Sequence, residues 1–373
     1  MDQDLFEFIR NNLRQFGFKD KRVKFKLILQ FIDGVIREAK KSINKYKTVD
    51  ILETSVQSTL RWLKRHYKHL KKFQSWLYGL AQNNRDKRSN TYIIIDDTIV
   101  ERASKTAYGV SKLFDHSTGQ YVYGNCIVSL LISNQSLLLA LDQKFYISQK
   151  TESEECTTEF STKIKFGCEL INNLQIDKTR AYVVIDAWYT SKTILDAIKE
   201  KELFCVLAFK NSKKVSLFGK EYHLDDVFDK NKLRYFTLEG EKYLYDAKIL
   251  HLTGWGRYKV LMIKKEKDID FRFFLTNKID MKPINMMRHY IERWNVEQHY
   301  RDEKQHLGLK PFFMRSKDST ESYLNFVQWL FDVLSVYRYE LAKEGVTKPI
   351  ETIVDEYKKE FNKRTRDLMD ISI

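Results

Sequence analysis

The sequence lacks the features that mark several classes of protein. Its four cysteines, Cys126, Cys156, Cys168 and Cys205, include no Cys-x-x-Cys pair and have no histidines at zinc-finger spacing, so neither a structural zinc site nor a disulfide framework is indicated. The longest apolar run, CIVSLLI, is too short to span a bilayer, and the start, MDQDLFEF, is acidic where a secretory signal is basic. We therefore expect a soluble, cytoplasmic protein with buried thiols and no membrane partner.

Internal repeats and low-complexity segments are also absent from the sequence. It does have enough apolar residues for a large core, with 43% hydrophobic and 14% aromatic residues in a chain of 373. This length usually exceeds one compact core, so we expect a main domain with helical or inserted additions. The formal net charge of +15, spread along the whole chain, suits a polyanionic partner, although a generally lysine-rich proteome would give the same balance.

Residues 1–90 are predicted to form a helical DNA-binding region. Apolar residues recur at intervals of three and four from Phe6 to about Asn84, which leaves one apolar stripe and one basic face. A helix-turn-helix-like DNA reader and a plain helical bundle both fit this pattern, because no sequence signature separates them. The basic face supplies candidate DNA contacts at Arg61, Lys64 and Arg65.

Strand patterns begin at residue 91. The segments TYIIIDD and AYVVIDAWYT are short apolar runs typical of strands buried on both faces, and they end in carboxylates at Asp96 and Asp97 and at Asp186. Asn134 and Gln135 supply a turn between two further strands. An α/β fold is indicated, with a first part of the core at 91–210, an inserted antiparallel β subdomain at 211–270, a second part of the core at 271–345, and a charged tail at 346–373.

The segment HYIERWNVEQHYRDEKQHLGL, residues 289–309, has one glutamate, Glu297, among many cations and aromatics. At 100° per residue on a helix, Tyr290, Arg293, Glu297 and Lys304 fall within an arc of roughly 60°, and Arg301 lies just beside them. Aliphatic side chains flank this face and do not fill it. The face is therefore either solvated or a functional site.

Two strand ends help to choose between these alternatives. In open α/β sheets, ligands gather at the carboxyl edge of the strands, where Asp96 and Asp186 each follow an apolar run. An aspartate at a strand end is commonly a turn or cap residue, but two of them together with Glu297 make a set of hard oxygen ligands. Two Mg²⁺ ions about 3.5–4 Å apart are able to clamp the attacking and leaving oxygens of an in-line phosphoryl displacement. A phosphoryl-transfer site on DNA would need such a set of acids.

The spacing of Tyr290, Arg293, Glu297 and Lys304 resembles the Y-x2-R-x3-E-x6-K signature of bacterial DDE transposases, the cut-and-paste enzymes of insertion sequences. The segments IIIDDT and VVIDAWYTS resemble the strands that carry the first and second aspartates of that family. The resemblance covers roughly residues 91–309, including the position of the β insertion. It implies an RNase H-like core, in which a mixed five-stranded sheet with helices is interrupted by a β insertion.

The resemblance also implies metal ions, partners and residue roles. Such enzymes use two Mg²⁺ ions, which Mn²⁺ is able to replace, to cut one strand with water, and the freed 3′-hydroxyl attacks a phosphodiester across the duplex or in target DNA. The implied partners are double-stranded DNA, as terminal inverted repeats and as target, and a second copy of the chain in a homodimer on the DNA. The implied metal ligands are Asp96, Asp186 and Glu297, and the implied DNA contacts are Tyr290, Arg293, Lys304 and Arg301.

Asp97 is a rival to Asp96 as the first metal ligand, because the family's first acid is followed by threonine either directly or after one residue. The spacing Asp-x-Thr favours Asp96, and the alternation of side chains along a strand keeps the two from facing the metal ions in the same way. Trp255 or Phe271 from the β insertion would be the aromatic that stacks on a flipped base. A lone histidine such as His299 more often has a structural role.

Two other functions keep the same fold. A metal-dependent nuclease or resolvase of this superfamily would cut DNA without joining it, and a strand-transfer assay separates it from a transposase. A catalytically inactive DNA-binding protein derived from a transposase should lack at least one of the acids, and this sequence retains all three candidates. An active transposase is therefore the main hypothesis.

Overall fold

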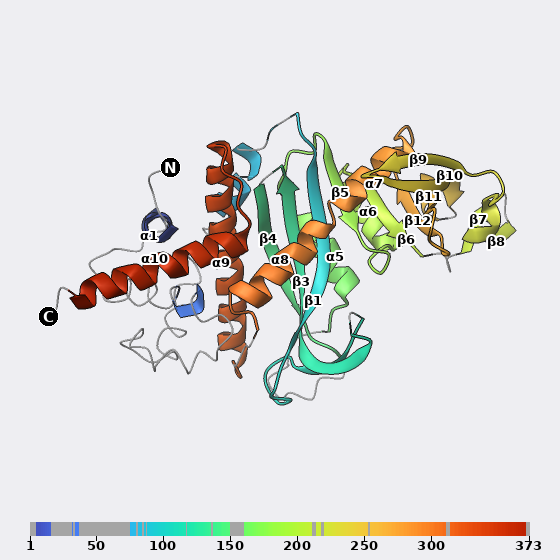
Figure 1. Cartoon of the computed structure of the whole chain (residues 1–373). Helices are drawn as coiled ribbons and strands as arrows, with labels where there is room; N and C mark the ends of the chain where they lie inside the picture. Colours follow the sequence, from blue (N-terminus) through green and yellow to red (C-terminus); the bar gives the residue numbers. More distant parts are fainter. Residues whose placement is uncertain are drawn as a thin grey trace.

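A computed structural model gives the structure of the chain (Figure 1). The candidate DNA contacts Arg61, Lys64 and Arg65 lie outside the residues that it describes, and they stay predictions. No helix in the described part of the chain is long and apolar enough to cross a membrane. The described residues are 5–15, 32, 34–36, 75–79, 81–83, 86, 88–116, 118–135, 137–149, 160–210, 214–217, 220–252, 254–310 and 314–370.

A large mixed sheet forms the centre of the molecule (Figure 1). Strand β1 (Thr91–Glu101) pairs antiparallel with β3 (Gln120–Asn134) and parallel with β5 (Ala181–Ile185). Strand β4 (Leu137–Tyr146) pairs with β3, and β6 (Phe204–Phe209) pairs parallel with β5. The resulting order β4-β3-β1-β5-β6 confirms the expected α/β class and is consistent with an RNase H-like core.

The central strands are buried because their sequences are continuous apolar runs. Every residue of β5 is buried, and so are Ile93, Ile94 and Ile95 of β1. The expectation that the first strand ends at its two aspartates is wrong, because β1 continues to Glu101 in its ladder with β3. Its parallel ladder with β5 does end at Ile95, opposite Ile185. Asp96 is therefore the first residue of β1 that has no pairing partner on β5.

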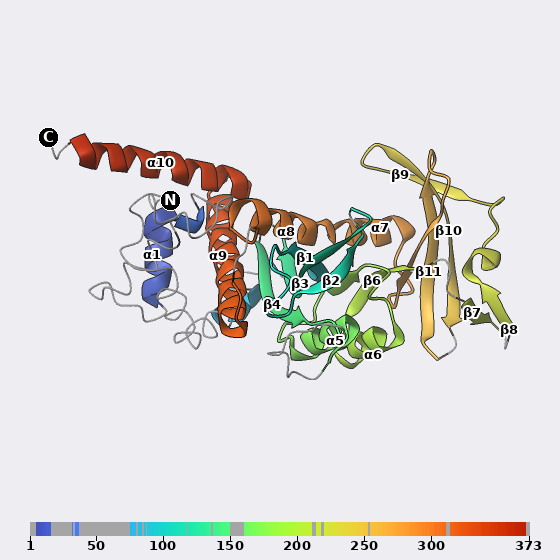
Figure 2. The same cartoon turned by 90° about the horizontal axis from the view of Figure 1, so that it is seen from below.

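Helices cover both faces of the sheet (Figure 2). Helices α5 (Lys163–Asn173) and α6 (Lys192–Glu200) lie on one face, and the side chains of Thr162 and Ser191 cap their first turns. Helices α7 (Pro283–Ile291) and α8 (Trp294–His306) lie on the opposite face. The hydroxyl of Tyr300 on α8 donates to the backbone oxygen of Asp96 at 2.9 Å, so α8 is fixed directly over the middle of β1.

The β insertion extends the same sheet beyond β6 (Figure 1). Strand β12 (Arg272–Thr276) pairs antiparallel with β6, and β11 (Gly256–Lys265), β10 (Glu241–Leu252) and β9 (Arg234–Leu238) follow in turn. The expected antiparallel strands are thus present, and they continue the core sheet. The remaining elements here are β7 (Lys214–Leu217), β8 (Lys220–His223) and a short 3₁₀ helix, η2 (Leu224–Val227).

A helical layer closes the other edge of the sheet. Helix α9 (Lys317–Lys343) packs against β4, where Oδ1 of its buried Asp332 accepts from the backbone N–H of Ala140 at 2.7 Å. Helices α10 (Ile350–Asp370) and α1 (Leu5–Gln15) lie beside α9, so both ends of the chain are far from the β insertion (Figures 1 and 2). The buried thiols Cys126, Cys168 and Cys205 are free, as expected.

Strand β2 (Ser111–Asp115) forms a hairpin with the first residues of β3. In Figure 1 this hairpin projects past the end of β1. Gly124 lies at the bend, where an added Cβ atom would be 2.7 Å from the backbone oxygen of Val100. Glycine is therefore required where the hairpin leaves the sheet.

Candidate active site

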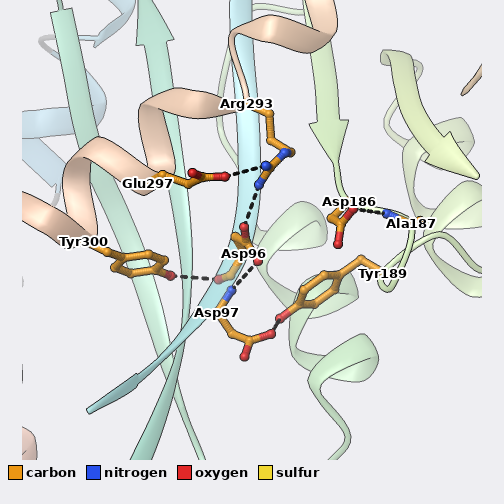
Figure 3. A network of polar contacts seen from close by, with 8 residues as sticks. All are labelled: Asp96, Asp97, Asp186, Ala187, Tyr189, Arg293, Glu297 and Tyr300. Carbon is orange, nitrogen blue, oxygen red and sulfur yellow. Dashed lines mark hydrogen bonds and ion pairs between the residues drawn. The ribbon is translucent and has the colours of Figure 1, made fainter. Parts of the chain in front are cut away.

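Three acidic residues approach one another from three elements (Figure 3). Asp96 lies on β1, Asp186 directly follows β5, and Glu297 lies in the first turn of α8. The Arg293 guanidinium joins two of them, with Nη1 3.0 Å from Oδ2 of Asp96 and Nη2 2.5 Å from Oε1 of Glu297. Asp96 and Glu297 are thus linked through one cation, and Asp186 lies at the end of the strand next to β1.

Asp96 is a partly buried acid whose protonation depends on the groups around it. The pKa of Asp96 is raised to about 7, mainly by burial and to a smaller extent by the nearby charges of Asp97 and Asp186. The backbone N–H of Asp97, which donates to Oδ1 of Asp96 at 2.9 Å, and the Arg293 charge act in the opposite direction on this pKa. The Asp96 carboxylate thus needs a cation beside it, and Arg293 supplies one.

Asp97 points to the opposite face of the sheet. Its carboxylate is 2.6 Å from Nζ of Lys163 and accepts a hydrogen bond of 2.8 Å from the Tyr189 hydroxyl. The Cys126 thiol also donates to it, at 3.4 Å. Alternation along β1 therefore separates the two aspartates as expected, and Asp96 is the one that shares a cation with Glu297.

The turn that carries Asp186 is held at several points. The backbone N–H of Ala187 donates to Oδ1 of Asp186 at 2.7 Å, and the N–H of Tyr189 donates to the Asp186 backbone oxygen at 3.1 Å. The Thr190 hydroxyl donates to the backbone oxygen of Ala208 at 2.7 Å. Only 1% of Tyr189 is exposed, and its hydroxyl ties this turn to Asp97 on β1. The second aspartate is therefore positioned by bonds to both neighbouring strands.

The expectation that one helix carries all four signature residues is wrong. Helix α7 ends at Ile291 and α8 begins at Trp294, with Arg293 between them. The backbone N–H groups of Arg293 and Val296 bond to oxygens three residues back, those of Tyr290 and Arg293, at 3.0 and 3.1 Å. This tighter 3₁₀-type turn changes the direction of side chains relative to a regular helix. The side chain of Arg293 extends from the break between the two helices and contacts both Asp96 and Glu297.

The structure places the predicted DNA-contacting residues at different depths. Burial raises the pKa of Tyr290 to about 12, and its ring packs against Phe274 with 4.6 Å between centroids. Nζ of Lys304 donates to the Thr98 hydroxyl at 2.6 Å, while Arg301 is exposed. Of these four residues, Arg293 contacts Asp96 and Glu297, which the sequence analysis predicts to be metal ligands. The DNA roles of all four residues stay predictions.

The acids can be tested against the metal ions that the resemblance implies. Carboxylate oxygens are the donors that Mg²⁺ prefers, and Oδ2 of Asp186 forms no hydrogen bond with a described residue. Within the described part of the chain, no group of three or more His, Cys, Asp or Glu side chains is arranged to hold a metal ion. Arg293 lies between Asp96 and Glu297 as their shared cation (Figure 3). The chemistry of these carboxylates suits a hard divalent ion, but their arrangement around Arg293 does not form a metal site.

Other candidate residues have mainly packing contacts. Trp255 packs against Phe209 with 5.6 Å between ring centroids, and Nζ of Lys264 lies 5.2 Å from the centroid of Phe271. Only 1% of His299 is exposed, and burial lowers its pKa to about 3, which agrees with a structural role. Stacking of Trp255 or Phe271 on a flipped base stays a prediction.

Lys163 is the residue near the site that sequence reasoning missed. It pairs with Asp97, and its ammonium group lies 5.3 Å from the ring centroid of Trp188. No local pattern marks it, because residues 97 and 163 meet only through the packing of α5 on the sheet. A surface lysine and this partly buried one are indistinguishable in the sequence.

Comparison with known families agrees with this arrangement. A family model described as the transposase DDE domain matches residues 87–330, which include all three acids and the whole β insertion. No curated protein matches the chain. Enzymes of this family act on DNA and generally use divalent metal ions. The match covers more than half of the sequence, and the chain therefore belongs to the DDE transposase family.

Proposed function

We propose that this protein cuts the ends of an insertion sequence and joins them to target DNA, with Asp96, Asp186 and Glu297 as the metal ligands. One observation carries the proposal: Asp96 of β1 and Glu297 of α8 share the guanidinium of Arg293, and Asp186 follows the neighbouring strand β5 at the same edge of the sheet. A solvated helix face would not bring a buried aspartate and a helical glutamate onto one cation. The order of the acids in the chain is also that of the family.

The arrangement suits phosphoryl transfer on DNA. Two Mg²⁺ ions, or Mn²⁺ in their place, would supply the charge that activates water and stabilises the leaving 3′-oxygen. Asp96, Asp186 and Glu297 hold that charge at the carboxyl edge. Hydrolysis breaks the bond between phosphorus and the 3′-oxygen, which takes up a proton, and the new 3′-hydroxyl then attacks a phosphodiester across the duplex or in target DNA.

Arg293 has two partners in this scheme. In the structure its guanidinium forms ion pairs with both Asp96 and Glu297. When the acids bind divalent ions, the guanidinium is released and a DNA phosphate becomes its partner, for which its planar donors are suited. The ring centroid of Tyr290 lies 5.9 Å from Cζ of Arg293, so this ring is beside the guanidinium. Lys304 and Arg301 extend the cationic face along α8. Joining requires two ends at once, so a homodimer on DNA belongs to the proposal.

The substitution Glu297→Gln tests the assignment. It keeps the size of the side chain and removes the charge that holds metal, so the variant should bind transposon ends and fail to cut them in Mg²⁺. Glu292→Gln is the matched control, because Glu292 lies five residues earlier and contacts Asn295 at 3.0 Å. The control should cut at nearly the wild-type rate. Comparable cutting by the Glu297 variant and the wild type would remove Glu297 from the mechanism.

A second assay separates the proposal from a nuclease of the same fold. Duplexes with a pre-cut 3′-hydroxyl end are incubated with target DNA and the wild-type protein in Mg²⁺. A transposase forms joined products, whereas a nuclease or resolvase cuts intact ends and forms none. Cutting without joining would leave the assignment of the acids in place and overturn the transposition step.

A further inference from the structure

The hairpin of β2 and β3 exposes large aromatic side chains. The exposed fractions are 41% for Phe114, 66% for Tyr121 and 37% for Tyr123. Phe114 contacts Tyr121 edge to face with 5.2 Å between ring centroids, so these rings form one cluster. Aromatic side chains gathered on a surface commonly mark a binding site.

Two exposed lysines lie over these rings. Nζ of Lys112 is 5.2 Å from the ring centroid of Tyr121, and Nζ of Lys105 is 4.6 Å from that of Tyr123. Lysine and tyrosine side chains commonly contact the phosphates and sugars of DNA. We call Lys105, Lys112, Phe114, Tyr121 and Tyr123 the hairpin surface.

The register of the strands places the hairpin surface on the same face of the sheet as the active site. Asp96 pairs with Ser129 of β3, and Tyr123 and Tyr121 precede Ser129 by six and eight residues. Even spacing along a strand keeps side chains on one face. Lys112 pairs with Tyr123, and Phe114 pairs with Tyr121, so all of these β2 and β3 side chains share that face. It is the face that α8 covers.

The pKa of Lys304 on α8 responds to charges at the end of β2 and at the end of β1. Lys304, which bonds to Thr98 two residues after Asp96, has a pKa that is lowered mainly by burial. The hairpin residue Asp115 and Glu101 act on this pKa in the opposite direction, so both are within electrostatic reach of Lys304. Asp115 is half-buried, whereas Lys105 and Lys112 are exposed. The outer part of the hairpin is therefore basic.

The distance to the active site corresponds to less than one turn of DNA. At about 3.3 Å per strand residue, six to eight residues span roughly 20–26 Å. With about 3.4 Å per base pair along the helix axis, this equals roughly six to eight base pairs.

We propose that the hairpin surface binds the backbone of double-stranded DNA within about eight base pairs of the phosphate that is cut. The lysines contact phosphates, and the rings pack against sugars, so this contact does not depend on base sequence. The inference rests on the proposed function only for the position of the DNA, because the cut phosphate lies at Asp96, Asp186 and Glu297.

Salt dependence tests the charge contacts without cleavage. Binding of a random-sequence duplex of about 30 base pairs is measured by fluorescence anisotropy without divalent ions, at several salt concentrations. The double substitution Lys105→Gln and Lys112→Gln should lower the slope of log K against log salt by about 1.8, since each phosphate contact contributes about 0.9. The control is Lys232→Gln with Lys242→Gln, two exposed lysines of the β insertion. The control should leave the slope unchanged.

A photocrosslinking residue at Tyr121 tests the position of the DNA. The control places the same residue at Tyr235, which is 69% exposed with Nζ of Lys242 5.2 Å from its ring centroid, at the far end of the sheet. Position 121 should crosslink to the duplex, and position 235 should not. On a duplex carrying the cut site, the crosslink should lie within about eight base pairs of the cut.

The outcomes separate this inference from the proposed function. An unchanged slope in the hairpin variant, or equal loss in both double variants, overturns the inference even if the wild type cuts and joins DNA. The expected slope and crosslink with no cutting would support the inference and overturn the proposed function. A hairpin variant that alters self-association without DNA and keeps its slope would identify a protein contact, which also overturns the inference.

Discussion

The bond between Tyr189 and Asp97 leads to a prediction about the second acid of the site. The substitution Tyr189→Phe removes one hydroxyl and leaves the buried ring in place. This hydroxyl donates to Oδ1 of Asp97 at 2.8 Å and joins the turn after Asp186 to β1. Its loss therefore loosens the position of Asp186 relative to Asp96 and keeps both acids.

The expected size of the effect follows from the contacts. A hydrogen bond to a charged group contributes about 1.5–3 kcal/mol, and Lys163 remains paired with Asp97, so we expect a loss of about 2 kcal/mol. With an unfolding entropy of about 2.1 cal/mol/K per residue over 373 residues, the melting temperature should fall by roughly 3 °C. Displacement of a catalytic group by about 1 Å lowers rates on the order of 100-fold. Because Thr190 still anchors the turn, we expect cutting to slow by between about 10- and 100-fold.

The assay measures the rate of end cutting in Mg²⁺ well below the melting temperature, together with the affinity for end DNA. Tyr182→Phe is the matched control, since Tyr182 lies on β5 and its hydroxyl contacts Nζ of Lys278 at 3.3 Å. The control should lose a similar amount of stability, cut normally and bind DNA normally. Equal cutting rates in the two variants would refute the positioning role of Tyr189.

Three further predictions concern Arg293, Lys304 and His289. Arg293→Ala should weaken the binding of transposon ends and lower the slope of log K against log salt by about 0.9. Calorimetry without DNA should show that this variant binds Mn²⁺ more tightly than the wild type. Arg301→Ala is the control, and an unchanged slope in the Arg293 variant would count against a phosphate contact. Lys304→Met should weaken end binding by roughly tenfold with cutting at saturating DNA preserved, and a normal affinity would contradict its DNA role. Burial lowers the pKa of His289 from 6.5 to about 4, so the unfolded chain binds its proton first and stability falls as pH drops from 6.5 through 4, by about 3 kcal/mol. Urea unfolding at pH 7 and pH 4 should show this decrease in unfolding free energy for the wild type. The decrease should be smaller by about 3 kcal/mol for His289→Gln. Equal decreases in the two proteins would refute the role of His289.

The sequence predicted the parts of the fold that depend on local pattern. The apolar runs before Asp96 and Asp186 became the buried strands β1 and β5, because such runs are stable only when both faces are covered. The turn between β3 and β4 is where the sequence predicted it, with Asn134 ending β3 and Gln135 following at a φ of 53°. The meeting of Asp96 and Glu297 followed from the resemblance, since no local pattern relates positions 201 residues apart.

Other features depend on tertiary packing and could not be read from the sequence. The extension of β1 to Glu101 depends on the partner strand β3, which the apolar run does not describe. The break at Arg293 has no proline or glycine to mark it, and the pair of Lys163 with Asp97 requires α5 to lie against the sheet. In each case the residue types are ordinary, and the partner decides the structure.

The contacts of Arg293 explain why one glutamate lies among so many cations. Asp96 is buried enough for its pKa to reach about 7, and Glu297 lies at the other end of the same guanidinium. Leaving a fully buried ion pair with one partner missing costs about 3–5 kcal/mol, and these acids, which are partly exposed to solvent, would oppose folding by less than that without Arg293. A divalent ion that enters the site must therefore bind more strongly than the guanidinium that it displaces. The DNA phosphate that receives Arg293 favours this exchange, so metal binding and DNA binding at this site should strengthen each other.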